Sequence, residues 1–407
     1  MKNTLRLAGL LTILIVGSGC AAPISGQAKP GMTPVDLATL KTGAAVTEPT
    51  AFDLKYSDTA KSVRLIEGRR LLNVLVQPID VDPELTKRLT TKVFADGTDM
   101  SKDDGLPAQF KAAVDDNSFI AGVTASRTNG SVRDTKGLHL SVLHFATAQD
   151  SKNAAAAMYQ VSTSGENPRQ PVTIPGYAEA NGSSKDGTAV SVFQAHGPFV
   201  IAVSMSQETA DPAGLATKIK KTLDLQLPAL DKYRVVAPDD LLDLPLDPDG
   251  IMRRATGKSP SGDPYGMSYH EEDFGTFEPS GILHFERNPA EARKAFDAAG
   301  VDLVGRRFST VYRTRDVEAA FTLQTALAKR GKGDSELAPP PGIADAQCLR
   351  LEDEDPNRGY NGICVLVYGR YVAVVMSLAS VSKAALQVDP ILQERTAAQY
   401  AILKKSE

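Results

Sequence analysis

The sequence predicts an α+β fold, made of two tandem copies of an antiparallel sheet with helices packed on one face. Three observations support this prediction. A unit of about 170 residues occurs twice in tandem along the chain. Within each unit, segments that alternate with a period of two are separated by segments with helical spacing. The strands are joined by short turns, which requires antiparallel neighbours, and helices with one apolar stripe must cover a sheet.

The duplication is visible as four sequence matches that occur in the same order. Segments 71–78, 145–147, 175–180 and 197–203 return as 241–248, 312–314, 341–346 and 369–375. Four ordered matches indicate a tandem repeat. We therefore expect a first α+β repeat at residues 51–235 and a second at residues 236–407, with one strand order in both.

The elements follow in the same order in each copy. Helices are expected at 110–116 and 151–160 in the first copy and at 290–299 and 317–330 in the second. Strands are expected at 120–126, 138–146, 177–184, 189–196 and 199–206, and then at 308–313, 343–351, 362–368 and 371–378. The segment 282–285 also alternates and is expected to be a strand.

The last strand and helix of the first copy illustrate the two periods. Along 199–206, one face carries Phe199, Ile201, Val203 and Met205, and the other carries Val200, Ala202, Ser204 and Ser206. Asp211 and Pro212 then have the chemistry of an N-cap and a first helical position. The helix that follows has an apolar stripe, and Pro228 is expected to end it.

The first twenty residues have the features of an export signal. Lys2 and Arg6 precede an apolar run at 7–16 and the small residues before Cys20. The run is too short to span a bilayer, which needs about 20 apolar residues. We expect a signal peptide at 1–19 and lipidation of Cys20, although Gly17 stands where a lipobox usually has leucine. The alternative is an ordinary cleaved signal with an incidental cysteine.

Lipidation would place the protein on the extracytoplasmic face of the cell membrane. A diacylglyceryl group supplies two chains, which is enough for stable attachment. Residues 20–50 contain Pro, Gly, Ala and Thr with little periodicity and are expected to form a tether. Loss of Lys2 and Arg6 with the signal takes the formal net charge from −4 to −6, which argues against a nucleic-acid partner.

Two further cysteines lie in the second repeat. Cys348 falls in one expected strand and Cys364 begins the next, with a polar loop between them. Facing positions on antiparallel strands are about 5 Å apart, which is within disulfide range, and an exported protein meets oxidising conditions. We expect a structural disulfide, because a redox-active pair would favour CxxC spacing. Gly182 and Val192 hold the equivalent places in the first copy.

An acidic loop between these cysteines resembles a metal site only in part. Asp353, Asp355 and Asn357 begin like a calcium loop, but the glycine comes one place late, at Gly359. Cys364 stands where such a loop needs a bidentate glutamate. A solvated acidic turn is the preferred interpretation.

The histidines do not form a recognisable constellation either. His139 and His144 are five apart on one expected strand, so they point to opposite faces. His270 to Asp273 and His284 lack the HExxH spacing of a zinc site. No nucleophile elbow is present. We therefore expect no catalytic residues, no metal and no cofactor, and predict that the protein is not an enzyme.

Several segments resemble a known family. They are 64–71, 281–285, 298–302, Cys364 and 368–373. Together they are similar to a family of actinobacterial lipoproteins, known mainly as a domain of unknown function and frequent in mycolate-making genera such as Nocardia, Rhodococcus and Mycobacterium. The resemblance covers nearly the whole mature chain and implies a location in the actinobacterial cell envelope. It implies no catalytic residues.

Two classes of function remain. The favoured one is a non-catalytic binding or interaction module for an envelope lipid, a glycolipid or another envelope protein. The second is a structural or assembly lipoprotein without a small ligand, and an envelope hydrolase is a third alternative. The strand at 371–376 favours binding because it is apolar on both faces, so that one face must meet a ligand, a further element or the other domain.

Overall fold

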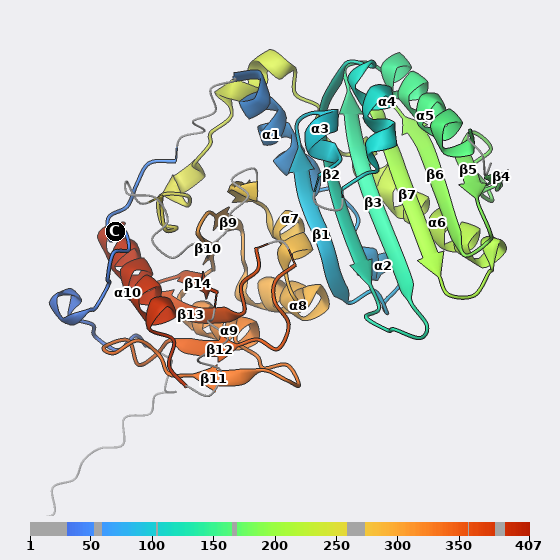
Figure 1. Ribbon diagram of the computed structural model, residues 1–407. Helices are drawn as coiled ribbons and strands as arrows, with labels where there is room; N and C mark the ends of the chain where they lie inside the picture. The colour runs from blue at the N-terminus through green and yellow to red at the C-terminus, as the bar shows by residue number, and fades with distance from the viewer. Residues whose placement is uncertain are drawn as a thin grey trace, which may run out of the picture.

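A computed structural model describes residues 31–52, 59–102, 105–164, 169–258, 273–356, 358–378 and 387–407. Over these residues the chain forms two seven-stranded antiparallel sheets that lie side by side, one from each repeat (Figure 1). Helices pack against both sheets. The predicted α+β class and its tandem organisation are confirmed.

The two sheets have one topology. The first contains β1 (Lys87–Phe94), β2 (Phe119–Thr128), β3 (Lys136–Phe145), β4 (Gln170–Pro171), β5 (Asn181–Ser184), β6 (Ala189–His196) and β7 (Phe199–Gln207). The second contains β8 (Gly275–Phe277), β9 (Leu303–Arg306), β10 (Ser309–Arg313), β11 (Ser335–Leu337), β12 (Gln347–Arg350), β13 (Gly362–Tyr368) and β14 (Tyr371–Ser377). Their orders are β1-β2-β3-β7-β6-β5-β4 and β8-β9-β10-β14-β13-β12-β11. The same order in both sheets agrees with the duplication.

Three helices of each repeat hold corresponding places. The first repeat has α1 (Thr59–Leu72), α2 (Pro78–Val81), α3 (Gly97–Met100), α4 (Lys111–Asp115), α5 (Ala148–Thr163) and α6 (Pro212–Asp231). The second has α7 (Pro279–Ile282), α8 (Pro289–Ala299), α9 (Val317–Leu327) and α10 (Pro390–Lys405). Helices α4 and α8 precede the second strand of their sheets, α5 and α9 follow the third, and α6 and α10 follow the last. Short 3-10 turns lie at Leu37–Thr39, Ala108–Phe110, Pro238–Asp243, Pro248–Gly250 and Leu283–Phe285.

The helix starts are set by local chemistry. The side chains of Asp211 and Asp389 accept hydrogen bonds from backbone N–H groups at the starts of α6 and α10, and each is followed by proline. Asp316 caps α9 in the same manner. Pro228 does not end α6, as the sequence analysis expected. It lies in the last turn, where only one intrahelical hydrogen bond is lost.

Helices cover both faces of each sheet, which corrects the expectation of one covered face. In the first sheet, Ile201 of β7 packs in the core that includes α1 and α6, while Val200 packs with α4 and α5 on the other side. In the second sheet, Val372 of β14 packs with α8 and α9, and Ala373 packs with α10. The physical reason is that a central strand with apolar residues on both faces must be covered twice.

The segment 282–285 is helical rather than a strand. Pro279 occupies the first position of α7, and the following 3-10 turn continues the helical backbone. Four residues are too few for an alternating pattern to distinguish a strand from a buried helical turn.

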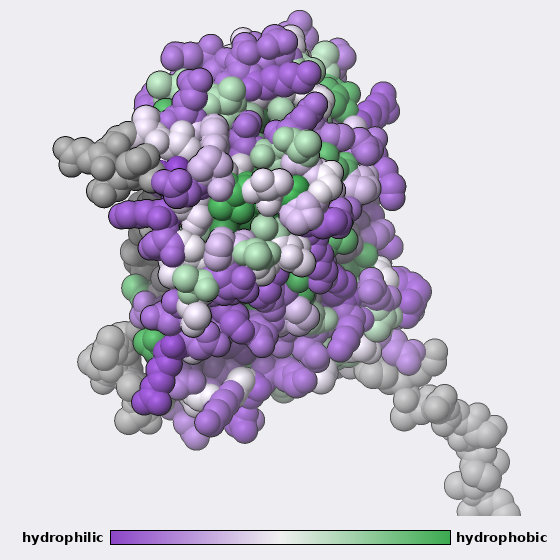
Figure 2. Space-filling view, turned by 90° about the vertical axis from the view of Figure 1, so that its right-hand side faces the viewer, coloured by the Kyte–Doolittle hydropathy of each residue, from purple (hydrophilic) through white to green (hydrophobic). Residues whose placement is uncertain are grey.

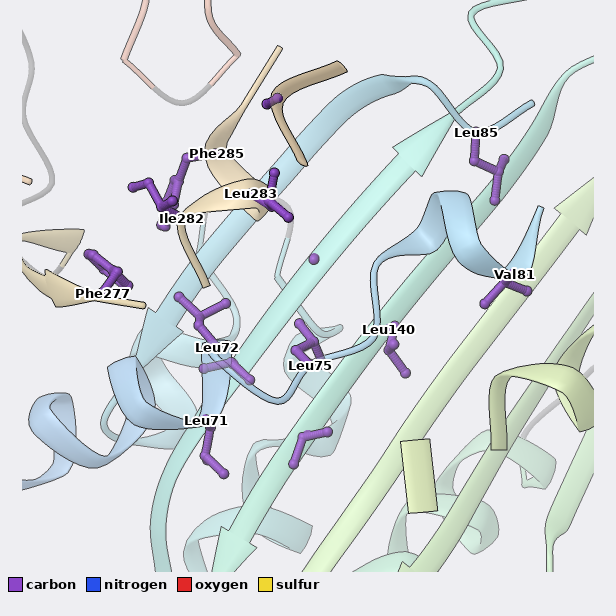
Figure 3. Close-up of a cluster of buried hydrophobic side chains, with 14 of the residues drawn as sticks. Leu71, Leu72, Leu75, Val81, Leu85, Leu140, Phe277, Ile282, Leu283 and Phe285 are labelled. Atoms are coloured by element: carbon purple, nitrogen blue, oxygen red, sulfur yellow. The ribbon is translucent and has the colours of Figure 1, made fainter. Parts of the chain in front are cut away.

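One apolar core joins the two repeats. Leu72 and Leu75, at and beyond the end of α1, lie near Ile282 and Leu283 of the second repeat (Figure 3). Each such side chain contributes about 1.5–3 kcal/mol when it is fully buried. His284 adds a hydrogen bond from its Nε2 to the Leu75 carbonyl oxygen at 2.9 Å. The repeats are therefore packed as one unit.

Candidate functional site

The predicted disulfide is present. Cys348 of β12 and Cys364 of β13 are register partners, with Cα atoms 4.0 Å apart. Gly182 and Val192 pair in the same way in the first sheet. Both cysteines are buried, so the bridge stabilises the second sheet. Cys20, the predicted lipidation site, lies outside the described residues.

The residues that resembled metal sites have other partners. Asp353 pairs with Lys87 at 3.3 Å, and Asp355 with the buried Arg88. Burial lowers the pKa of His284 to about 3, so its imidazole is neutral and donates to the Leu75 carbonyl. His270 lies outside the described residues. Within the described parts of the chain, no group of three or more His, Cys, Asp or Glu side chains could hold a metal ion.

The first sheet carries a polar row that crosses five neighbouring strands. The row consists of register partners, whose side chains share one face, and its members are Ser126, His139, Ser204, Ser191 and Ser183. The Ser191 and Ser204 hydroxyls are 3.2 Å apart. On the same face, Val200 and Ala202 are apolar and are covered by α5. The polar row begins where this apolar cover ends.

A pocket of about 390 Å³ lies over this row. Its apolar lining includes Leu106, Pro107, Phe110 and Phe193. Its polar lining includes Gln109, His139, Ser162, Arg169, Ser191 and Ser204. The rings of Phe110 and Phe193 meet edge to face, with centroids 5.2 Å apart. A pocket lined by both apolar and polar side chains suits an amphipathic ligand.

Arg169 is the charged side chain of the pocket. Its Nε donates to the Ser183 hydroxyl at 3.1 Å, and its Nη2 donates to the Ser183 carbonyl at 3.0 Å and the Ser191 hydroxyl at 3.2 Å. These three bonds fix the plane of the guanidinium group. Burial lowers the Arg169 pKa from its usual 12.5, and the distant Asp186 carboxylate acts in the opposite direction.

His139 contacts two buried hydroxyls. Its Nε2 lies 2.9 Å from the Thr124 hydroxyl and 3.3 Å from the Ser141 hydroxyl, and Ser141 donates to Thr124 at 2.9 Å. Thr124 and Ser141 are both fully buried. His144 points to the opposite face, as expected, and lies 3.0 Å from the buried Glu67.

The sequence analysis did not identify this pocket. The sequence feature that could have indicated the pocket is a change from apolar to polar residues on one face of a strand, as from Ala202 to Ser204. Similar changes occur at the ends of many strands. Only the register shows that the residues from five strands form one row.

A second pocket, of about 400 Å³, lies where the repeats meet. Its charges are largely engaged with one another. Lys87 pairs with Asp353 across the junction, Arg88 pairs with Asp355, and Arg287 with Asp334 at 2.7 Å. The first two ion pairs join the repeats and the third lies within the second repeat, and the pocket over the polar row is therefore the stronger candidate for a ligand.

Comparisons with known proteins identify a family whose function is unknown. The N-terminal model of a domain of unknown function, DUF7373, matches residues 54–246, and its C-terminal model matches residues 251–406. No curated protein matches. A solved structure, the extracellular domain of PknH from Mycobacterium tuberculosis, has 10% identity and a TM-score of 0.25, covering 37% of this chain and 93% of that one. A likeness this low supports no inference. In the described residues, no helix is long and apolar enough to cross a membrane.

Proposed function

The chain belongs to the DUF7373 family, and from this premise we propose that it is a non-catalytic binding protein of the cell envelope. The pocket over the polar row of the first sheet is its binding site. The family has no assigned function, so the proposal depends on the chemistry of this chain.

The observation that carries the proposal is the mixed lining of one pocket. Leu106, Pro107 and the nearly buried Phe110 and Phe193 supply apolar contacts, while Ser191, Ser204 and Arg169 can orient a polar part of a ligand. The volume of about 390 Å³ falls in the range of small-molecule sites. A lipid or glycolipid combines both kinds of surface.

The same geometry favours binding over reaction. A nucleophile must reach both its base and the substrate. The His139 Nε2 contacts the hydroxyls of Thr124 and Ser141, and both are fully buried. Neither of these two hydroxyls can attack a ligand in the pocket without a rearrangement of the sheet. Ser204, the register partner of His139, does line the pocket, and its hydroxyl lies 3.2 Å from that of Ser191.

The proposed location is the outer face of the cytoplasmic membrane of an actinobacterium. Cys20, preceded by an export signal, would carry the lipid. The expected tether at 20–50 is corrected from residue 31 onward, because Val35 is buried in the core of the second repeat and Thr33 bonds to Asp345; residues 20–30 lie outside the described residues. The surface is consistent with this arrangement. Figure 2 views the side on which β4 and β5 lie in Figure 1, and most of it is hydrophilic, with a small hydrophobic group near the middle. Such a surface suits a domain held away from the bilayer.

A variant that fills the pocket tests the proposal. Ser204 faces the pocket, and Phe at this position would occupy the space above the row. Ser206 lies on the same face of β7, is exposed and does not line the pocket, so Ser206→Phe is the matched control. The proteins are purified from a mycolate-making host, and organic extracts are analysed by mass spectrometry. We expect lipid with the parent and Ser206→Phe, and little with Ser204→Phe.

A structural role without a small ligand is the second candidate. It is favoured by the continuous core between the repeats and by the ion pairs at their junction. Under that alternative, the parent yields no lipid, or all three proteins yield equal amounts. Either result would contradict the binding proposal and favour the structural role.

A further inference from the structure

The Arg169 guanidinium is held by uncharged groups, as are those of Arg127 and Arg254, whereas other arginines form ion pairs. Arg293 forms a two-bond ion pair with Asp80, at 2.7 and 2.8 Å, and Arg313 pairs with Asp302. The hydrogen bonds of Arg169 go to Ser183 and Ser191 alone. Among the described residues, no carboxylate lies within ion-pair distance of it. Within the described residues, its positive charge is therefore not neutralised by direct contact.

The carboxylate of Asp186 acts to raise the Arg169 pKa from a distance but does not form an ion pair with it. Asp186, in the turn between β5 and β6, is exposed, and its Oδ1 accepts hydrogen bonds from the Thr188 hydroxyl and backbone N–H at 2.7 and 3.0 Å. An exposed carboxylate is screened by water and salt. The described residues that line the pocket include no Asp or Glu.

The remaining edge of the guanidinium is available to a ligand. Nε and Nη2 are used by Ser183 and Ser191, which leaves Nη1 without a protein partner among the described residues. The hydroxyls of Ser162 and Ser204 line the same pocket and can add hydrogen bonds. A guanidinium group with neighbouring hydroxyl donors is well suited to anionic oxygens such as those of a phosphate.

We propose that the pocket binds an anionic amphiphile, with a phosphate-type head group on Arg169 and an apolar chain against Phe110 and Phe193. This inference rests on the proposed binding function and specifies its ligand class. The head group supplies an anionic partner to the half-buried cation, and the chain packs against the apolar lining, in which the two rings are already nearly buried.

Three probes separate the contributions of the head group and the apolar chain to the affinity: octyl phosphate, octanol with the same chain, and inorganic phosphate. Binding to the full mature chain is measured by calorimetry for the parent, Arg169→Gln and Arg169→Lys. Arg133→Gln, in the exposed β2–β3 turn, is the control. We expect octyl phosphate to bind the parent more tightly than either other probe. Arg169→Gln should weaken octyl phosphate about ten- to hundredfold, since a hydrogen bond to a charged group contributes about that factor.

Octanol affinity should be equal in the parent and Arg169→Gln, which shows that the pocket remains folded. The affinity of Arg169→Lys for octyl phosphate should lie between those of the parent and Arg169→Gln. The affinity of Arg133→Gln should equal that of the parent. The inference is overturned if Arg169→Gln binds octyl phosphate like the parent, or if inorganic phosphate binds as tightly as octyl phosphate. If neither octanol nor octyl phosphate binds the parent, the proposed function fails as well.

Discussion

Replacing both cysteines of the second repeat should lower the free energy of unfolding by about 3 kcal/mol. The bridge joins Cys348 and Cys364, which are 16 residues apart, and closing a loop of this size restricts the unfolded chain by about that amount. Alanine is the suitable replacement because both sites are buried and would not tolerate a new polar group. The double substitution also avoids a free thiol.

Urea unfolding of the purified mature protein, followed by circular dichroism, measures this difference. The parent in a reducing agent serves as the control, since it should approach the stability of Cys348→Ala/Cys364→Ala. The double variant itself should not respond to the reducing agent. A loss below about 1 kcal/mol, or a parent unaffected by full reduction, would refute the loop-entropy argument.

Three further outcomes are expected. Leu72→Ala, in the core between the repeats, should lower the free energy of unfolding by about 2–5 kcal/mol, and a loss under 1 kcal/mol in the same urea assay would contradict the shared core. Burial acts to raise the Glu67 pKa, but hydrogen bonds from His144 and Tyr233 leave it below 4.5. The stabilisation from Glu67 should therefore be complete above pH 4.5 and be lost as the pH falls through the folded-state pKa; urea titrations of Glu67→Gln should lack that acid-side loss. Cys20→Ala should move the protein from the membrane to the soluble fraction, and unchanged fractionation would disprove lipidation at Cys20.

Much of the fold could be predicted from local patterns. The strand bounds 189–196 and 362–368 agree with β6 and β13, because alternation and glycine turns are properties of short segments. The cysteine pairing followed from two neighbouring strands. The N-cap at Asp211 could be predicted because aspartate followed by proline is a typical sequence at the start of a helix.

The rest depends on contacts between distant segments. The alternation of 199–206 showed two faces, but it could not show that α1 and α6 cover one and α5 the other. The pocket depends on strand register, which pairs His139 with Ser204 and Ser204 with Ser191. Register is set by the whole hydrophobic pattern of a sheet and is not contained in any one strand.

The central claim is that a ligand binds over the polar row, and histidine NMR tests it most directly. The chain has five histidines, so the imidazole signals can be assigned with single His→Gln variants. His139 lines the pocket, and His284 lies buried between the repeats. On addition of octyl phosphate, we expect the His139 signals to shift and those of His284 to stay unchanged. Binding that leaves His139 unmoved would contradict the account.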